Sequence, residues 1–458
     1  MPVSVNRLVA AGLAAALLLS PPALAPAVAR ERPNPLVYTQ TKLANGLWVI
    51  LNEDHSTPIV HVSVTYHVGS KNERPGRTGF AHLFEHLMFQ GSKNVAQDQH
   101  QSFIASIGGE SNASTNEDST NYWETVPSHF LPLALWLEAD RMASLKVEDA
   151  AFRREREVVK EERRQRIESP PYGRLPEIVY DAAFTTHPYK HQVIGSMVDL
   201  EAARIEDVRD FFETYYVPEN AVLVIAGDFD ATETMAMVEK YFGRVPKAKK
   251  PVPRDIPAEP PQSTERRLTV YEDVPLPAVV VAHHITYDGH PDSYPLHIVN
   301  KVLSDGDSSR IYKSLVYEKR IALAAFGGGN IIEHPNLFFA TAIVQPGKTP
   351  DEVITALIAE LDRLRTEPIS DRELDRTKNQ FARDYILGRL TVKDKAEMLA
   401  HAAVIHNDLT TADGEFDIFL NITKADVQRV AKTYFTPATR TVITILPRSA
   451  SPTAEAKR

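Results

Sequence analysis

The chain of 458 residues contains no cysteine, so it can form neither a disulfide nor a lipid-anchored cysteine. This absence is compatible with an oxidising compartment but does not by itself indicate one. After residue 29 the sequence also lacks any apolar run approaching the roughly 18 residues of a membrane-spanning helix. The mature chain is therefore expected to be soluble, with no membrane span.

Positive charge is in deficit as well, because the net charge is −9 and is spread through both halves. Such a chain has no basic footprint for nucleic acid. A nucleotide loop is also missing, since the glycines 327–329 are not followed by the lysine and helix start that such a loop needs. These deficits exclude nucleic-acid and nucleotide binding as the expected function.

The N-terminus carries the longest apolar stretch, from Leu8 to Leu19, after the positive charge of Arg7. The small residues of Ala27-Val28-Ala29 then form a cleavage site, with cleavage after Ala25 as an alternative. This order predicts a secretory signal peptide over residues 1–29, and hence a periplasmic or secreted protein. The roughly 430 residues that remain exceed one comfortable core and predict two domains or more.

The stretch 82–86 contains side chains that can bind a metal ion. His82 and His86 stand four residues apart with Glu85 between them, and apolar residues at helical spacing surround them before Gly91. Residues at i, i+3 and i+4 share a helix face, so both imidazoles can bind one metal ion while Glu85 points at whatever else the ion holds. This is the inverted form of the His-Glu-x-x-His zinc-peptidase motif. On its own, such a pair also occurs as a surface accident.

A catalytic zinc generally needs three protein ligands and one open position, so a third ligand is required. The best candidates are Glu155 and Glu162, which stand two helical turns apart on one face of a charged run. Charge-rich helices usually face solvent. The His-x-x-Glu-His motif upstream is the reason to interpret this one as part of a metal site. Two histidines and one glutamate suit zinc better than iron or manganese, although the sequence does not exclude those metals.

These residues together resemble the pitrilysin/insulysin family of metallopeptidases, which includes mitochondrial processing peptidase. The shared pattern is His-x-x-Glu-His, then 75 residues, then Glu162 at the end of a Glu-Arg-x-Val-Val-x-x-Glu helix. The resemblance covers about residues 36–447 and includes the stretch 109–115 around Asn112 and Ala113. It implies a half-length family member, comparable to one side of a clamshell.

The resemblance implies one Zn²⁺ per chain, held by His82, His86 and Glu162. Glu155 would support the site without being a primary ligand. Asn112 and Ala113 would lie on an edge strand along which the substrate backbone is bound. Zinc lowers the pKa of a bound water and polarises a carbonyl. Glu85, which cannot reach the metal together with both histidines, would take the proton of the water and pass it to the leaving amine.

An internal repeat predicts the domain organisation. Residues 207–225, a helix followed by a proline and an apolar strand, recur at 426–445, where the helix and the proline lie 219 residues later. The same offset aligns the start of the strand 59–64 with the start of the strand 278–282. We therefore predict an α+β fold of two homologous domains, each an antiparallel sheet backed by helices. The predicted domains are a metal-binding peptidase domain at 30–245, a linker at 246–265 and a second domain at 266–458. The offset places the metal helix at 301–305, which carries no His and no Glu, so the second domain should hold no metal.

The second half departs from the family pattern. The family contributes an Arg, with a Tyr seven residues later, that binds the substrate carbonyl. Alignment on Glu318-Lys319-Arg320 places Tyr317 and Ala324 at those two positions, so both groups are missing. Loss of such donors typically costs several kcal/mol of transition-state stabilisation. Arg310 and Tyr312 lie nearby with the wrong spacing, so we expect a related, non-metal subunit to supply the pair in a heterodimer.

The sequence thus predicts a secreted or periplasmic zinc metalloendopeptidase subunit that hydrolyses peptides or small unfolded proteins. A non-catalytic scaffold or binding subunit of the same fold is one alternative, and a self-sufficient homodimeric peptidase is another. The presence of all four residues of the metal motif argues against the scaffold, and the missing Arg and Tyr argue against the homodimer.

Overall fold

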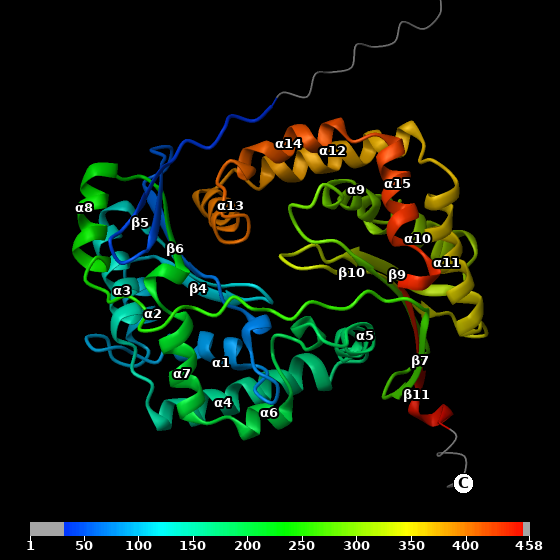
Figure 1. Cartoon of the computed structure of the whole chain (residues 1–458), viewed down its shortest axis with the longest axis horizontal. Helices are drawn as coiled ribbons and strands as arrows, with labels where there is room; N and C mark the ends of the chain where they lie inside the picture. Colours follow the sequence, from blue (N-terminus) through cyan, green and yellow to red (C-terminus); the bar gives the residue numbers. More distant parts are fainter. Residues whose placement is uncertain (1–31, 452–458) are drawn as a thin grey trace, which may run out of the picture. The chain divides into compact units, whose positions relative to one another are not determined.

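The computed structural model describes residues 32–451, so the predicted signal peptide lies outside the described part of the chain. From Asn34 to the end of the described part, the chain forms one compact unit, in which two β-sheets are each covered by helices (Figure 1). This arrangement confirms the predicted α+β fold. Within the described residues, no helix is both long and apolar enough to cross a membrane.

The two sheets share one strand order. Across the first sheet the strands are β1 (Thr39–Lys42), β2 (Trp48–Glu53), β6 (Ala221–Gly227), β3 (Ile59–Tyr66), β5 (Thr120–Pro127) and β4 (Glu110–Thr115). Across the second they are β7 (Arg266–Glu272), β11 (Arg440–Pro447), β8 (Ala278–Ile285), β10 (Asn336–Val344) and β9 (Ala322–Gly329). Apart from β1, each strand has its counterpart at the same place in the other sheet. In both sheets a single pair is parallel, β2 with β6 and β7 with β11, and the other neighbours are antiparallel.

The helices follow the same duplication. Those of the first half are α1 (Phe80–Leu87), α2 (Gln99–Ser106), α3 (Leu131–Ser144), α4 (Asp149–Arg163), α5 (Leu175–Ala183), α6 (Met197–Ala202), α7 (Ile205–Tyr215) and α8 (Ala231–Phe242). Those of the second half are α9 (Ser293–Ser304), α10 (Arg310–Tyr312), α11 (Pro350–Thr366), α12 (Asp371–Leu387), α13 (Val392–Val404), α14 (Thr411–Asn421) and α15 (Lys424–Tyr434). The 219-residue offset carries α1 onto α9, α5 onto α13 and α7 onto α15.

Each sheet buries both faces, because alternate residues of a strand point to opposite sides. On the first sheet, Val49 and Leu51 of β2 face a core shared with α1, α3, α7 and α8. Ile50, between them, faces a separate apolar cluster. On the second sheet, Val279 and Val281 of β8 face α9, α11 and α15, whereas Val280 points to the opposite side.

The two remaining sheet faces are covered by exchanged helices. Helix α13, from the second half of the sequence, buries Ala396, Leu399 and Ala403 against the first sheet. Its counterpart α5, from the first half, buries Val179 and Tyr180 against the second sheet. Each half of the chain therefore completes the core of the other.

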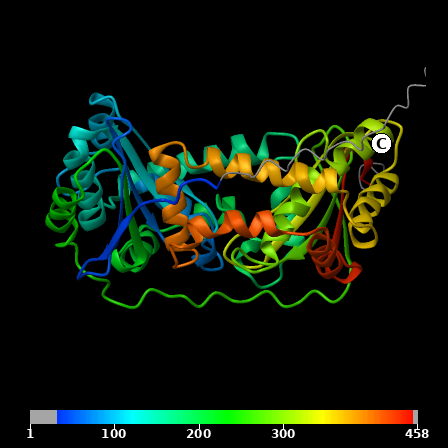
Figure 2. The same ribbon diagram turned by 90° about the horizontal axis from the view of Figure 1, so that it is seen from above.

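The segment 246–265 connects α8 to β7 without forming a helix or strand. It runs as an extended trace along one side of the molecule (Figure 2). The Glu259 carboxylate fixes it by accepting hydrogen bonds from the backbone N–H groups of residues 185–187, at 2.8–3.0 Å. The boundaries of the predicted domains stay a prediction. Each predicted domain places one of its helices, α5 or α13, on the sheet of the other.

Candidate metal centre

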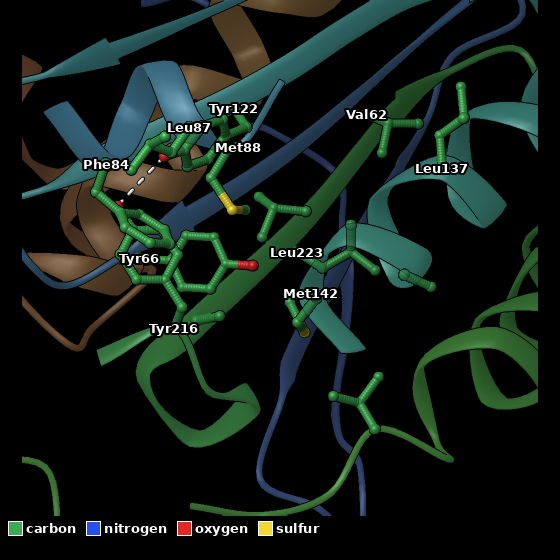
Figure 3. Packing of buried hydrophobic residues seen from close by; sticks show 14 of the residues in the cluster. Val62, Tyr66, Phe84, Leu87, Met88, Tyr122, Leu137, Met142, Tyr216 and Leu223 are labelled. Atoms are coloured by element: carbon green, nitrogen blue, oxygen red, sulfur yellow. Dashed lines mark hydrogen bonds between the residues drawn. The ribbon is translucent and has the colours of Figure 1, made fainter. Parts of the chain in front are cut away.

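Helix α1 is anchored by its apolar side. Phe84, Leu87 and Met88 point into the core beside Tyr122 and Tyr216, as Figure 3 shows, and the rings of Phe84 and Tyr216 lie 4.2 Å apart between centroids. The hydroxyls of the two tyrosines are 3.2 Å apart. Because a helix turns by 3.6 residues, this packing leaves His82, Glu85 and His86 on the opposite, partly exposed side.

The start of α1 is fixed by Gly79 and Glu73. Gly79 has a φ of 89°, and a Cβ there would lie 2.7 Å from the carbonyl oxygen of Ile194, so only glycine fits. The buried Glu73 carboxylate accepts hydrogen bonds from the N–H groups of Gly79 and Ala81 and contacts His191 Nε2 at 2.9 Å. An anion at a helix N-terminus satisfies free donors and complements the helix dipole. The role of Glu73 could not be found from the sequence, because a single carboxylate in a loop has no periodic signal.

The helix is shorter than the sequence predicts. Its regular part ends at Leu87, whereas apolar spacing extended it to the residue before Gly91. The N–H groups of Phe89 and Gln90 bond to carbonyls three residues back, which tightens the chain into turns. His86 consequently lies in the last turn of α1.

Helix α4 brings the predicted carboxylates to α1. Glu162 Oε2 lies 3.7 Å from His82 Nε2 and 3.5 Å from His86 Nε2. Glu155, two turns earlier, places Oε2 3.6 Å from the other ring nitrogen of His86, Nδ1. The fold therefore brings together the three predicted ligands, and it places Glu155 where it can orient one of them.

The spacing of these donor atoms fits a tetrahedral ion. Ligand bonds of about 2.1 Å in a tetrahedron separate neighbouring donors by about 3.4 Å, close to the distances of 3.5 and 3.7 Å measured here. Two imidazoles and one carboxylate are also a donor set that zinc prefers, and three ligands leave one position open. The residues of this chain therefore fit a catalytic type of zinc site.

The electrostatics of the site favour a cation. Burial lowers the pKa of His82 to about 4, which keeps this imidazole neutral and able to bind a metal. Burial also disfavours a charged His86, but the contacts with Glu155 and Glu162 outweigh it and raise the pKa of His86 to about 9. The carboxylates thus generate a negative field at the His86 ring, and a divalent ion would be attracted by the same field.

Glu85 lies between the donor cluster and the edge of the first sheet. The Thr115 hydroxyl, at the end of β4, donates a hydrogen bond to Glu85 Oε2 at 2.5 Å. Burial raises the pKa of Glu85. Strand β4 is the edge strand that carries Asn112 and Ala113, and its register pairs Asn112 with Trp123 of β5. Thr115 was part of the predicted motif, but its contact with Glu85 was not predicted.

The second half holds a different set of charges at the equivalent place. Lys301, at the position of His82, forms ion pairs with Asp305 at 3.3 Å and with Asp384 at 2.7 Å. Phe381 stands at the position of Glu162. A lysine and a phenylalanine thus replace two of the three donors, so the metal motif of α1 is not repeated at this place.

Arg310, the arginine near the position where the family pattern has its own, is already bound to another side chain. Arg310 donates two hydrogen bonds to the Glu373 carboxylate, at 2.7 and 3.0 Å. Burial opposes a charged Glu373, but the bonds from Arg310 hold the pKa of this carboxyl at about 2. Tyr317, where the family has its arginine, is largely exposed. Arg310 is therefore poorly suited to replace the missing group.

Comparison with known proteins shows the family of the chain. A family profile described as "Insulinase (Peptidase family M16)" matches residues 48–196, which include all the predicted site residues. A second profile, described as "Peptidase M16 inactive domain", matches residues 203–381. The zinc protease PqqE of Helicobacter pylori is 30% identical over 413 residues, which cover 90% of this chain and 93% of that protein. The chain belongs to the M16 peptidase family.

Two further similarities concern the length of this M16 chain. The β subunit of the mitochondrial-processing peptidase of Saccharomyces cerevisiae is 24% identical over 406 residues, covering 84% of this chain and 86% of the subunit. The crystal structure of a protease from Helicobacter pylori superposes with a TM-score of 0.86 at 31% identity, covering 90% of this chain and 100% of that one. The chain is therefore a half-length M16 member similar to proteins named as peptidases.

Proposed function

We propose that this M16 chain is a zinc-dependent metalloendopeptidase subunit that cleaves peptides or small unfolded proteins. The observation that carries the proposal is the convergence of His82, His86 and Glu162, with Glu85 hydrogen-bonded to the strand expected to bind substrate. The names of its relatives, a zinc protease and a processing-peptidase subunit, support the same chemistry.

In this proposal each site residue has a separate role. His82, His86 and Glu162 hold the zinc ion, which supplies Lewis acidity when it is bound. Glu155 fixes the orientation of the His86 ring through Nδ1. Glu85 accepts the proton of the attacking water and delivers it to the leaving nitrogen, while Thr115 keeps the carboxylate in place. The exposed edge of β4 pairs with the substrate backbone, since an edge strand has free N–H and C=O groups.

The proposal includes a partner subunit and a location outside the cytoplasm. Position 317 is not an arginine and position 324 is not a tyrosine, and Arg310 is bound to Glu373. These observations support a related subunit that supplies the oxyanion donors. The similarity to a peptidase that is named as a subunit is consistent with this. The predicted signal peptide supports a periplasmic or secreted site of action.

The proposal is tested by cleavage of a quenched fluorescent peptide of about 20 residues by the mature chain. Removing a general base typically lowers the rate by about 10²–10⁴-fold, so we expect Glu85→Gln to lose activity by that factor while its zinc content is unchanged. Glu161→Gln, a change of an exposed carboxylate on α4, is the matched control and should retain full activity. Cleavage that is equal in the wild type and Glu85→Gln would refute the assignment of Glu85.

The same assay distinguishes the alternatives. A zinc-loaded but inactive chain that becomes active on adding a related subunit supports the heterodimer. Activity of the chain alone that depends on Glu85 would show that no partner is needed and favour the homodimer. A chain that binds no zinc at His82, His86 and Glu162 would favour the scaffold.

A further inference from the structure

A second cluster of metal-ligand side chains lies away from α1. Asp288 follows β8 in the loop that leads to α9, His401 lies in the last turn of α13, and His406 lies just beyond the end of that helix. The Asp288 Oδ2 atom is 2.9 Å from His401 Nε2 and 3.5 Å from His406 Nε2. One donor atom from each of the three side chains lies within 4.8 Å of the other two.

The geometry of the cluster distinguishes it from a simple ion pair between an aspartate and a histidine. The two imidazoles, five residues apart in the sequence, direct the same ring nitrogen, Nε2, at a single carboxylate oxygen of a distant segment. Asp288 and His406 are each only 11% exposed in their side chains, whereas His401 is 53% exposed, so the cluster is built into the protein and opens on one side. An ion can enter from that side.

The position of His406 is also constrained by the backbone. Gly289 has a φ of 81°, and a Cβ at this residue would lie 3.0 Å from His406 Nδ1. The loop therefore passes directly against the imidazole ring. Glu415 of α14 adds a further carboxyl group close enough to interact electrostatically with Asp288 and both histidines.

We propose that Asp288, His401 and His406 form a second divalent-cation site, of the zinc class and separate from the site on α1. Neighbouring donors around a tetrahedral ion are about 3.4 Å apart. The distance from Asp288 to His406 already fits, and the distance to His401 must open by a few tenths of an ångström. A small rotation of the half-exposed His401 side chain provides that opening.

An ion at this place would join segments that belong to different sheets. Helix α13 covers a face of the first sheet, whereas Asp288 continues directly from β8 of the second sheet. Bound to all three residues, the ion would attach the C-terminal end of α13 to the second sheet. We therefore assign the site a structural role, holding the exchanged helix in position. The assignment does not depend on the proposed peptidase activity.

The test uses the mature chain with His82→Ala and His86→Ala, so that only the second site remains. After equilibrium dialysis against Zn²⁺ or Co²⁺, we expect one bound equivalent, and with Co²⁺ the visible absorption of a tetrahedral ion. Adding His401→Gln and His406→Gln should abolish both signals. Absence of the equivalent in the first variant, or its survival in the second, would overturn the proposal.

A control and a second measurement separate binding from misfolding. His55→Ala removes another imidazole that contacts two carboxylates, Glu53 at 2.8 Å and Asp228 at 2.6 Å, and should leave the metal content unchanged. Hydrogen exchange supplies the second readout, because Zn²⁺ should slow amide exchange at residues 402–409. The single change His401→Gln, at a half-exposed side chain, should remove this protection. Equal protection in both proteins would contradict the structural role.

Discussion

At the scale of single residues, the candidate site depends on contacts behind the ligands as much as on the ligands. Glu155 reaches Nδ1 of His86, which leaves Nε2 for the metal and fixes the ring. Glu73 holds the N-terminus of α1 through two backbone N–H groups. Neither carboxylate is among the proposed metal ligands, but both contact the groups that position those ligands.

Glu155 should therefore control zinc affinity without being a ligand. We expect Glu155→Gln to weaken zinc binding by about 10–100-fold, the usual effect of removing a partner of a metal-bound histidine. The zinc affinity is measured by competition with a chelator. The variants also carry His401→Gln, so that only the site on α1 contributes to the measured affinity. Glu157→Gln, on the exposed side of the same helix, is the control. Equal affinities of the two variants would show that Glu155 does not support the site.

The residues of the metal motif could be predicted because their spacing is local. His82, Glu85 and His86 share a helix face by arithmetic alone, and Glu162 followed from a resemblance that covers most of the chain. Glu73 and the contact of Thr115 with Glu85 could not be predicted in the same way. Each depends on how separate segments approach in three dimensions, which no period in the sequence encodes.

At the scale of the element, α1 is a short helix whose start is determined by its neighbours. Gly79 lies against the backbone at Ile194 and Gly195, so the direction in which α1 leaves the preceding loop is fixed by steric contact. This direction sets the two imidazoles opposite α4.

Substitution of Gly79 should therefore be costly for folding. We expect Gly79→Ala to lower the free energy of unfolding by about 3 kcal/mol, through its positive φ and the clash with the Ile194 carbonyl. Gly76 is the matched control, because its φ is also positive at 76° but a Cβ there meets nothing within 4 Å. Gly76→Ala should cost only about 1 kcal/mol. Chemical denaturation of both variants makes the comparison, and equal losses would refute the role of the clash.

At the scale of the whole molecule, the two sheets are joined by a buried group of charges. Lys71, which follows β3, pairs with Asp118 at 3.0 Å and also with Glu333. Glu333 lies between β9 and β10 and contacts His67 at 2.7 Å. Because Lys71 and Asp118 are almost fully buried, these pairs are little screened by salt.

These charges predict a loss of stability in acid. Burial opposes a charged Glu333, but His67 and Lys71 hold its pKa at about 2, below the ordinary 4.5. A depressed pKa stabilises the fold above pH 4.5, and this contribution disappears as the pH falls from about 4.5 to 2. At pH 7 Glu333→Gln should cost at most about 3 kcal/mol, and less where solvent reaches the carboxylate. Unfolding curves of both proteins should converge near pH 2, and a constant difference would contradict the prediction.

Much of this architecture could be predicted from the 219-residue repeat. The repeat placed β3 and β6 of the first sheet on β8 and β11 of the second, and the structure gives both sheets one strand order. The exchange of α5 and α13 could not be predicted. The apolar face of a helix shows that it must be covered, but it does not show which of two similar sheets will cover it.

The exchange also predicts how the chain responds to a cut. We expect proteolysis within 246–265 to yield two fragments that remain together, because α5 and α13 bury their apolar faces on the opposite fragment. Size-exclusion chromatography of the nicked protein should give one peak at the position of the intact chain. Separation of the fragments under native conditions would refute the prediction, and urea should separate them only as the protein unfolds.

The exchanged position of α13 has a consequence for the time course of synthesis. The last strand of the first sheet, β6, ends at Gly227, but the helix that covers its outer face is complete only at Val404. At about 5–20 residues per second, a ribosome needs roughly 10–35 s to make the 177 residues between these points. Throughout that interval Ile50, Val222 and Val224 lack their final covering, so the nascent chain holds an apolar surface open until synthesis is almost finished.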